Sequence, residues 1–495
     1  MIYNKEKALW YKNLCEKCDY VLQNNLSIER VSISSLHVLN EHPSNLSKYS
    51  HLFNKGKGRR IKESFKSALI QIKELLSFYY KKERNNKEPL TETNVVFISH
   101  LLNKEQIGKE DFYFGNLPET LKKEGFSTNV ILTNNIRFNI SNVKLWDHQM
   151  AGRVILKKIL NFKEEINLRF RLSKELKVLT KELNKTKESN LKKVYQFAID
   201  EVLSSRSIAS LRFYIQFKQL FKILRPKVLI LTYEGHSWER LAFAAAREII
   251  PEVKCIGYHH TINFPLQHAS NRLLGNNFDP DIVLTAGDIS KNQFQKYFNQ
   301  NLVKVKTLGI HRRVINKDVN SIRFNESSTC LVVPDGIISE VLILFNFVIS
   351  AAKNNPNIKY IFRLHPAVSL QSLKKSYPEF NELPFNFIFS NNSLQDDINS
   401  SRWVLYRGSN AAVYSVIFGL RPFYLEMDGE LTIDSLSNLN TWKKKIKNIE
   451  QFIKFALKDL TISDSDLYQE SIDAINYCNS YFLPLNNNVL LEELR

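Results

Sequence analysis

The chain has 495 residues, of which 43% are hydrophobic and 12% aromatic, and its formal net charge is +19. This length favours two or three domains over a single core, and the composition excludes wholesale disorder. The charge is compatible with nucleic acid, an anionic membrane surface or an acidic substrate. Because no zinc-finger, basic-zipper or RNA-recognition signature accompanies the lysines, we expect no nucleic-acid partner.

The cysteines and the apolar segments indicate the compartment. The chain has five cysteines, and its one close pair, Cys15 and Cys18, is followed by no second Cys/His pair at zinc-finger spacing. Reduced thiols, an N-terminus without a secretory signal and the lack of an apolar run near twenty residues predict a cytoplasmic protein. Basic clusters at 55–60 and 442–447 could contact anionic lipid headgroups, although solvated helix faces explain them equally well.

The first half of the chain begins with a predicted helical, basic segment over residues 1–90. Two buried strands are expected at 95–100 and 129–133. Leucines at helical spacing between 168 and 183 then predict a long amphipathic helix, paired with another over 190–223.

From residue 228 onwards, strands alternate with helices, which predicts mostly parallel α/β sheets. In chain order, we expect strands at 228–232, 253–258, 281–285, 303–305, 329–333, 360–362, 387–389, 404–405 and 422–426, and helices at 237–249, 339–353 and 410–419. A polar stretch at 311–328 marks a domain boundary. The predicted fold is two Rossmann-like domains that face a central cleft, 91–315 with a long helical insertion and 316–495 with C-terminal helices.

Several strands of the C-terminal half end in residues that suit a phosphate. The candidate nucleotide- and phosphate-binding residues are Asp335, Gly336, Arg363, Pro366, Arg407, Gly408, Ser409 and Asn410. Arg363 and His365 alternate along a strand and so share one face, where a guanidinium and an imidazole could clamp a phosphate and donate a proton. Ser409 is a predicted N-cap, and the amides and positive dipole end of its helix would attract an anion.

Candidate acceptor-side residues follow strands of the N-terminal half. Glu234 and His236 lie in a predicted strand-to-helix turn, where a desolvated carboxylate can act as a general base. His259 and His260 end the next strand on the same edge of the sheet. In the alternative interpretation, Glu234 is only a helix cap and the residues after it, Glu239 and Arg240, lie on the surface.

A metal site is not expected from this sequence. The acidic pair Asp396 and Asp397 lies at a predicted helix start and is interpreted as a cap, and adjacent histidines point to opposite sides of a strand. We therefore predict neither a metal ion nor another cofactor.

The motifs at Glu234-Gly235, His365-Pro366 and Ser409 together resemble the three-motif pattern of bacterial sialyltransferases and Kdo transferases, which are GT-B enzymes that use CMP-activated sugars. The resemblance covers about 228–426. It implies that Glu234 deprotonates the acceptor hydroxyl, that His365 binds or protonates the departing CMP phosphate, and that Ser409 with the Asn410 amide holds this phosphate. The first motif carries one acid where the family has two, and Asn410 stands where a second hydroxyl is usual.

The predicted function is therefore metal-independent glycosyl transfer in the synthesis of surface polysaccharide or lipopolysaccharide. The expected partners are a CMP-sugar and a glycan or lipid-linked acceptor, and the basic charge suggests peripheral contact with the inner face of a membrane. The motif 363–366 with 408–410 also resembles the CDP-glycerol glycerophosphotransferases of teichoic-acid synthesis. The sequence is compatible, too, with a UDP-sugar transferase and with a carbohydrate-binding protein that has a degenerate cleft.

Overall fold

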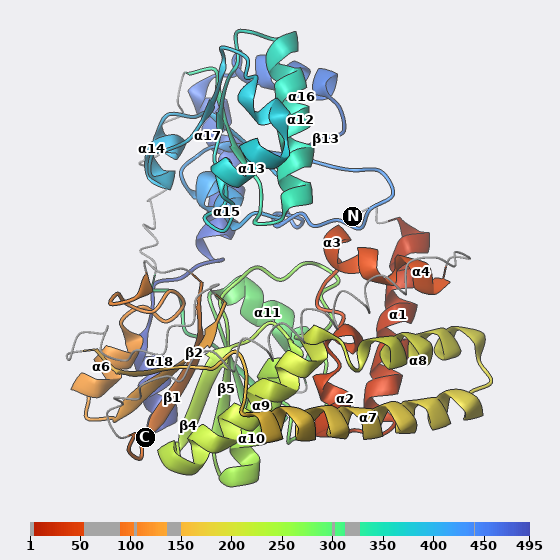
Figure 1. The fold of residues 1–495 in the computed structure, drawn as a ribbon. Helices are drawn as coiled ribbons and strands as arrows, with labels where there is room; N and C mark the ends of the chain where they lie inside the picture. The colour runs from red at the N-terminus through yellow and green to blue at the C-terminus, as the bar shows by residue number, and fades with distance from the viewer. Residues whose placement is uncertain are drawn as a thin grey trace.

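The computed structural model of the protein describes residues 4–53, 90–102, 106–135, 150–298, 302–311, 327–439 and 441–495. These residues form two α/β domains, one above the other in Figure 1, and each domain is built around its own parallel sheet. The predicted two-domain α/β fold is confirmed. The predicted boundary between 315 and 316 lies outside the described residues.

The N-terminal domain contains a seven-stranded sheet in the order β3-β2-β1-β4-β5-β6-β7, in which all neighbours are parallel. The strands are β1 (Val95–Leu101), β2 (Thr128–Asn134), β3 (Gly152–Ile155), β4 (Val228–Thr232), β5 (Lys254–His259), β6 (Ile282–Thr285) and β7 (Lys304–Thr307). Val96 and Ile98 of β1 enter one hydrophobic cluster, and Val95 and Phe97 enter another. Both faces of the sheet are therefore covered, which explains the continuous apolar runs of its central strands.

The C-terminal domain contains a six-stranded sheet in the order β10-β9-β8-β11-β12-β13, again wholly parallel. Its strands are β8 (Thr329–Val333), β9 (Lys359–Phe362), β10 (Phe387–Phe389), β11 (Trp403–Tyr406), β12 (Arg421–Leu425) and β13 (Lys444–Ile446). Along β8, Leu331 and Val333 face one cluster while Cys330 and Val332 face the other. This sheet too is a central layer between helices.

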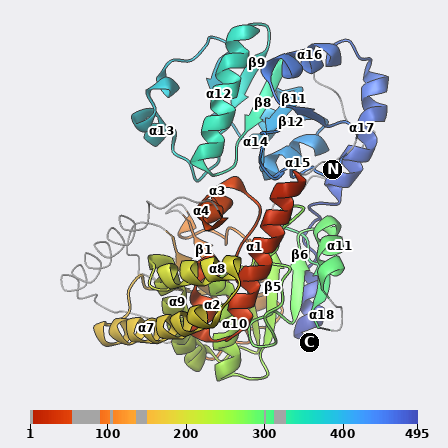
Figure 2. The same ribbon diagram turned by 90° about the vertical axis from the view of Figure 1, so that its right-hand side faces the viewer.

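The helices cover the two sheets in Figures 1 and 2. In the N-terminal half they are α1 (Lys5–Gln23), α2 (Ile28–Ser32), α3 (Pro43–Leu46), α4 (Ser50–Phe53), α6 (Leu117–Lys123), α7 (Phe162–Lys185), α8 (Ser189–Glu201), α9 (Ser205–Leu224), α10 (Ser237–Ile249) and α11 (Asp288–Tyr297). In the C-terminal half they are α12 (Ile338–Asn354), α13 (Leu370–Ser376), α14 (Leu394–Asn399), α15 (Asn410–Ile417), α16 (Ile449–Asp459), α17 (Asp464–Asn479) and α18 (Asn487–Leu494).

Most predicted elements are confirmed to within one or two residues, but three differ. The helix expected over 190–223 is two helices, α8 and α9, because Ser204 caps a new helix after the chain turns. The short strands β3 and β13 were not predicted. Both lie at a sheet edge and have only three or four residues, so neither carries enough apolar pattern to reveal it.

The helices of residues 4–53 belong to the N-terminal domain and do not form the separate segment that the sequence predicts. Leu14, Cys18 and Leu22 of α1 are buried in the same cluster as β4 and α10. Cys15 and Cys18 are free, buried thiols on this helix, as predicted. Figure 2 shows α1 beside α8, so segments far apart in sequence share one core.

The C-terminal segment returns from the second domain to the first. The Leu483 amide donates to the Ala286 carbonyl over 2.9 Å, and the Ile310 amide donates to the Leu483 carbonyl over 2.8 Å. Helix α18 then buries Leu490 in the same cluster as Val95 and Phe97 of β1, in the lower domain of Figure 1. The predicted C-terminal domain, 316–495, includes this last helix, but α18 packs on the N-terminal domain.

Candidate functional site

The strand order of each sheet defines a switch point, where successive strands are added on opposite sides of a central strand. In the first sheet this point lies between β1 and β4, and in the second it lies between β8 and β11. Ligands of open parallel sheets bind beyond the carboxyl ends of the strands at such points. The predicted residues Glu234, Asp335 and Gly408 each lie two positions after the end of a strand, β4, β8 and β11 respectively.

The turn after β4 is shaped by the carboxylate of Glu239. It accepts the backbone N–H groups of Glu234, Gly235 and His236 over 2.9, 2.7 and 2.9 Å. His236 is the N-cap of α10 and forms a capping box with Glu239. Glu239 is thus buried in the turn and is not the surface residue of the alternative interpretation, and Glu234 does not cap the helix.

Gly235 allows this turn to lie against the loop after β5. Its φ is +87°, and a Cβ at this position would lie 2.3 Å from the backbone carbon of Ala269 and 2.5 Å from the amide nitrogen of Ser270. Both the left-handed backbone and the contact with main-chain atoms oppose any side chain. Residue 235 therefore has to be glycine for the turn to keep this position.

We expect Gly235→Ala to destabilise the protein by at least about 2 kcal/mol, because the left-handed backbone alone costs about 1–2 kcal/mol and the clash adds to it. Denaturant unfolding measures this change. The matched control is Gly275→Ala, since Gly275 also has a positive φ, of +102°, but a Cβ there would meet nothing within 4 Å. Equal losses in the two variants would contradict the close approach.

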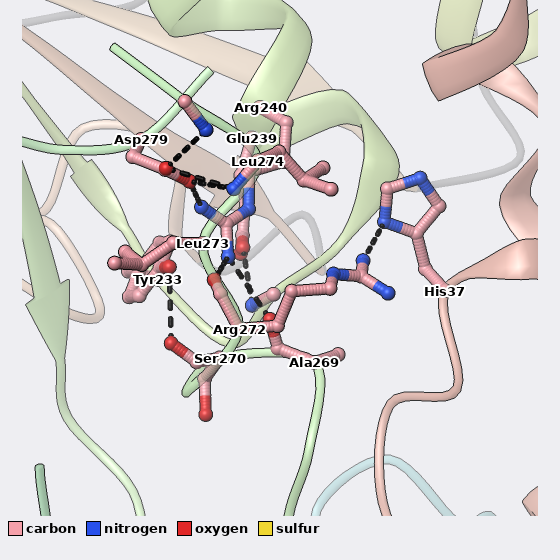
Figure 3. Close-up of polar contacts among 12 residues, drawn as sticks. His37, Tyr233, Glu239, Arg240, Ala269, Ser270, Arg272, Leu273, Leu274 and Asp279 are labelled. Carbon is pink, nitrogen blue, oxygen red and sulfur yellow. Dashed lines mark hydrogen bonds and ion pairs between the residues drawn. The ribbon is translucent and has the colours of Figure 1, made fainter. Parts of the chain in front are cut away.

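Arg240 holds the loops around this turn in place (Figure 3). Its guanidinium pairs with Asp279 and donates to the carbonyls of Ala269 and Arg272 over 3.0 and 2.8 Å. Tyr233 adds a hydrogen bond from its hydroxyl to the Ser270 carbonyl over 3.1 Å. Arg240 is fully buried, so its interpretation as a surface residue is wrong.

The side chain of Glu234 is half-buried between two imidazoles. His236 Nε2 lies 3.4 Å from one carboxylate oxygen, and His260 Nε2 lies 3.6 Å from the other. Burial raises the pKa of Glu234, but the hydrogen bond from His236 and the nearby His260 outweigh burial and hold this pKa well below its usual range. Glu234 is therefore a carboxylate at neutral pH.

His100 is a site residue that the sequence analysis missed. It lies in β1, beside β4, and its Nε2 is 3.3 Å from the Thr232 hydroxyl. Its ring packs edge-on against Trp238 at 5.2 Å, and burial lowers its pKa to about 4, so the ring is neutral. No pattern in the residues around His100 marks it, because its place follows from the strand order, in which the first and fourth strands are neighbours and their carboxyl ends adjoin.

The two adjacent histidines of β5 have different environments. His260 faces Glu234 and packs against the Tyr113 ring at 4.4 Å. His259 is completely buried, with its Nδ1 2.8 Å from the Tyr233 carbonyl and its ring against Phe294. The structure therefore places His260 beside Glu234 and buries His259, because successive side chains of a strand point to opposite faces.

At the second switch point, Asp335 and Gly336 lie beside His365. A Cβ on Gly336 would be 3.0 Å from Nδ1 of the exposed His365 ring, so the end of β8 adjoins the loop after β9. One oxygen of Asp335 accepts the Ile337 amide over 2.8 Å, and the other lies 3.0 Å from Nε2 of His42. His42 thus links the N-terminal helices to the C-terminal sheet.

The loop after β11 brings the two sheet edges together. Ser409 is the N-cap of α15, as predicted, and its hydroxyl accepts the Ala411 amide over 3.3 Å. A Cβ on Gly408 would lie 3.5 Å from Asp335 and 3.6 Å from the Phe264 ring of the N-terminal domain. The carboxyl edges of β8 and β11 therefore meet the loop that follows β5. Pro366 and Asn410 are exposed beside this region.

The two predicted phosphate-binding arginines are engaged elsewhere. Arg407 is fully buried, pairs with Glu340 and Glu430, and donates to the Leu425 carbonyl over 3.0 Å. Its role is structural, which corrects the sequence prediction. Arg363 donates from Nη1 to the buried Asp397 over 2.8 Å and to the Asn392 carbonyl over 2.8 Å, so part of its guanidinium is held by the protein. Both arginines meet acids that lie far away in the sequence.

Other predicted features can be placed in the fold. Asp396 accepts from Ser393 in a capping box, which confirms the helix-start interpretation. The basic cluster at 442–447 is only partly exposed: Trp442 and Lys443 are buried, and Lys443 pairs with Asp434 over 2.6 Å, whereas Lys445 and Lys447 are exposed. The cluster at 55–60 lies outside the described residues.

The described side chains offer no ready metal site. Within the described ranges, no group of three or more His, Cys, Asp or Glu side chains is arranged to hold a metal ion. Nor does any helix in these ranges have the length and hydropathy needed to cross a bilayer.

The sequence of the chain matches no protein-family model and no curated protein. Similar solved structures include a Listeria monocytogenes protein assigned as a UDP-N-acetylglucosamine 2-epimerase, with a TM-score of 0.48, 12% identity and coverage of 81% of this chain and 95% of that chain. MurG from Acinetobacter baumannii has a TM-score of 0.45 and 9% identity, over 81% of this chain and 99% of that chain.

A third similar structure is the UDP-GlcNAc 2-epimerase of Neisseria meningitidis bound to UDP-GlcNAc. Its TM-score is 0.40 and its identity is 12%, with coverage of 81% of this chain and 99% of that chain. Similarity at this level carries no information about activity. The strand orders of the two sheets and the meeting of their carboxyl edges define a GT-B-like fold of two Rossmann-like domains.

Proposed function

We propose that the protein is a glycosyltransferase that moves a sugar from a nucleotide donor to an acceptor hydroxyl, in the synthesis of a surface polysaccharide or lipopolysaccharide. The observation that supports this best is the approach of the second switch point to the N-terminal domain, where Gly408, beside Asp335, adjoins Phe264 in the loop that follows β5. A donor beyond β8 and β11 and an acceptor beyond β1 and β4 would then face each other.

In this proposal the N-terminal edge activates the acceptor. The acceptor oxygen attacks the anomeric carbon of the donor sugar, the bond from that carbon to the phosphate oxygen breaks, and the hydroxyl proton passes to Glu234. The ionised state of Glu234 allows it to accept this proton, although its low pKa makes it a weak base. An acceptor hydroxyl that displaced the His236 hydrogen bond would raise this pKa and strengthen the base.

The C-terminal edge would hold the departing nucleotide. The exposed His365 ring can donate a hydrogen bond or a proton to the leaving phosphate. The first amides of α15, beginning with Asn410, would bind the same phosphate with the positive end of the helix dipole. Asp335 and Gly336 line the neighbouring strand end and would contact the rest of the nucleotide.

For the donor we propose a CMP-sugar, on the resemblance of the motifs at Glu234, His365 and Ser409 to those of CMP-sugar-dependent transferases. A CDP-alditol or a UDP-sugar would use the same strand-end amides, and a carbohydrate-binding protein would use none of them. The proposed acceptor is a glycan or lipid-linked saccharide, and the proposed place of action is the cytoplasmic side of a membrane.

Thermal unfolding with CMP, CDP and UDP in the presence of EDTA tests this proposal. A ligand at one hundred times its dissociation constant adds about 2.7 kcal/mol to the free energy of unfolding, so a true site raises Tm clearly. We expect CMP to give the largest increase and Asn410→Pro, which removes one amide of the α15 terminus, to reduce it. A shift with UDP alone would overturn the CMP assignment, strict Mg²⁺ dependence would overturn metal independence, and no shift with any nucleotide would favour a carbohydrate-binding protein.

A further inference from the structure

The outer face of α7 carries large apolar side chains that the fold leaves exposed. Phe162, Ile166 and Phe170 are spaced four residues apart and therefore lie in one row, and they are 62%, 53% and 57% exposed. The opposite face of α7 buries Leu168 and Leu172 in the core. These three apolar residues are thus not needed to dock the helix on its own domain.

Lysines continue the same face toward the C-terminal end of the helix. Lys174, Lys177 and Lys181 are exposed and follow Phe170 at helical spacing. The Lys174 ammonium lies 4.5 Å from the centre of the Phe170 ring, which joins the apolar row to the basic row. We call these six residues the α7 outer face.

The acidic residues of α7 do not neutralise this face. Glu164 accepts a hydrogen bond from Gln219 and Glu165 pairs with Arg212, both on α9. Glu175 and Glu182 pair with the buried Arg30 of α2. These carboxylates therefore point toward the interior of the N-terminal domain. The lysines of the outer face add to a chain whose net charge is already +19.

We propose that the α7 outer face binds the surface of a bilayer that contains anionic lipids. The aromatic and aliphatic side chains would enter the interfacial region, and the lysines would contact the anionic headgroups, as in amphipathic helices that lie on membranes. Figure 1 shows α7 on the side of the N-terminal domain away from the C-terminal domain, so such contact leaves the second domain clear of the membrane. A second copy of the chain fits less well, because a symmetric contact would set the lysine row of each copy against either the lysine row or the apolar row of the other.

Flotation of the full chain with two kinds of vesicle tests the proposal. We expect binding to phosphatidylcholine vesicles that contain phosphatidylglycerol, and much weaker binding to phosphatidylcholine alone. One lysine near an anionic surface changes the partition coefficient about fivefold, so the triple variant Lys174→Glu, Lys177→Glu, Lys181→Glu should lower it at least about 100-fold. The triple variant Phe162→Ser, Ile166→Ser, Phe170→Ser should also lose about 100-fold, because each residue buries apolar surface in the interface.

A matched control separates the α7 outer face from the overall charge. The variant Lys359→Glu, Lys374→Glu, Lys375→Glu makes the same charge change at exposed lysines of the C-terminal domain, and it should retain binding within about threefold. Thermal unfolding verifies that each variant is folded, as expected for exposed positions. Equal losses in control and α7 variants would overturn the proposal. The proposal would also be overturned if the wild-type protein did not bind anionic vesicles but formed a dimer that the triple serine variant abolished.

Discussion

Replacing Glu234 by glutamine is expected to lower turnover by about 10²- to 10⁴-fold while the protein stays folded, because this is the usual contribution of a general base. Glutamine has nearly the same shape as glutamate, but its neutral amide cannot take up the proton that the carboxylate would accept. The turn itself should persist, since Glu239 and not the Glu234 side chain binds the backbone amides of residues 234–236. Transfer assays and thermal unfolding on the same preparation measure both effects.

Two further measurements make this prediction specific. Glu248→Gln is the matched control, because Glu248 is a half-exposed carboxylate that pairs with Lys218 on the domain surface, and it should leave turnover unchanged. In the wild type, the lowered pKa keeps Glu234 ionised when the pH falls below the ordinary glutamate pKa of 4.5. The stability that this charge contributes is therefore fully present above pH 4.5 and is lost in stronger acid, as the pH falls toward the lowered pKa. Normal turnover in the glutamine variant would rule out Glu234 as the base and leave it a binding residue.

Arg240→Met should destabilise the protein by about 3–5 kcal/mol, because the buried carboxylate of Asp279 keeps its hydrogen bonds from the Leu274 and Gly275 amides but loses its counter-charge. The variant also removes the hydrogen bonds to the Ala269 and Arg272 carbonyls that fix the loop against Gly235. Denaturant unfolding measures the decrease in the free energy of unfolding. Lys447→Met breaks a solvent-exposed pair with Asp428 and is the control, expected to unfold like the wild type.

The double variant Arg240→Met, Asp279→Leu tests the cause of this loss. If the isolated charge of Asp279 is responsible, removing it should recover part of the stability lost in Arg240→Met. The single variant Asp279→Leu is measured as well. If the loss of stability in the double variant equals the sum of the losses in the two single variants, the destabilisation comes from packing and from the carbonyl hydrogen bonds.

Local pattern was sufficient for most of the fold. The apolar runs of β1, β4 and β8 predict strands because each is buried on both faces, and the helices α10 and α12 follow from their spacing and length. The Ser409 cap and the helix-start position of Asp396 were predicted for the same reason, since a cap involves atoms only two or three residues apart. The placement of Glu234 after a strand also follows from adjacent residues.

What the sequence determined by itself was therefore the α/β class, the strand ends and the residues that stand there. Tertiary structure alone decided which of these side chains remain accessible, because partners distant in sequence compete for them: Arg407 meets Glu340, and Arg363 meets Asp397. It also placed His100 beside Thr232, because strand order is set by how the helices pack on the sheet and not by any local pattern. A residue's type and its neighbours along the chain fix what it can do chemically, whereas only the folded contacts fix whether it faces a ligand or the core.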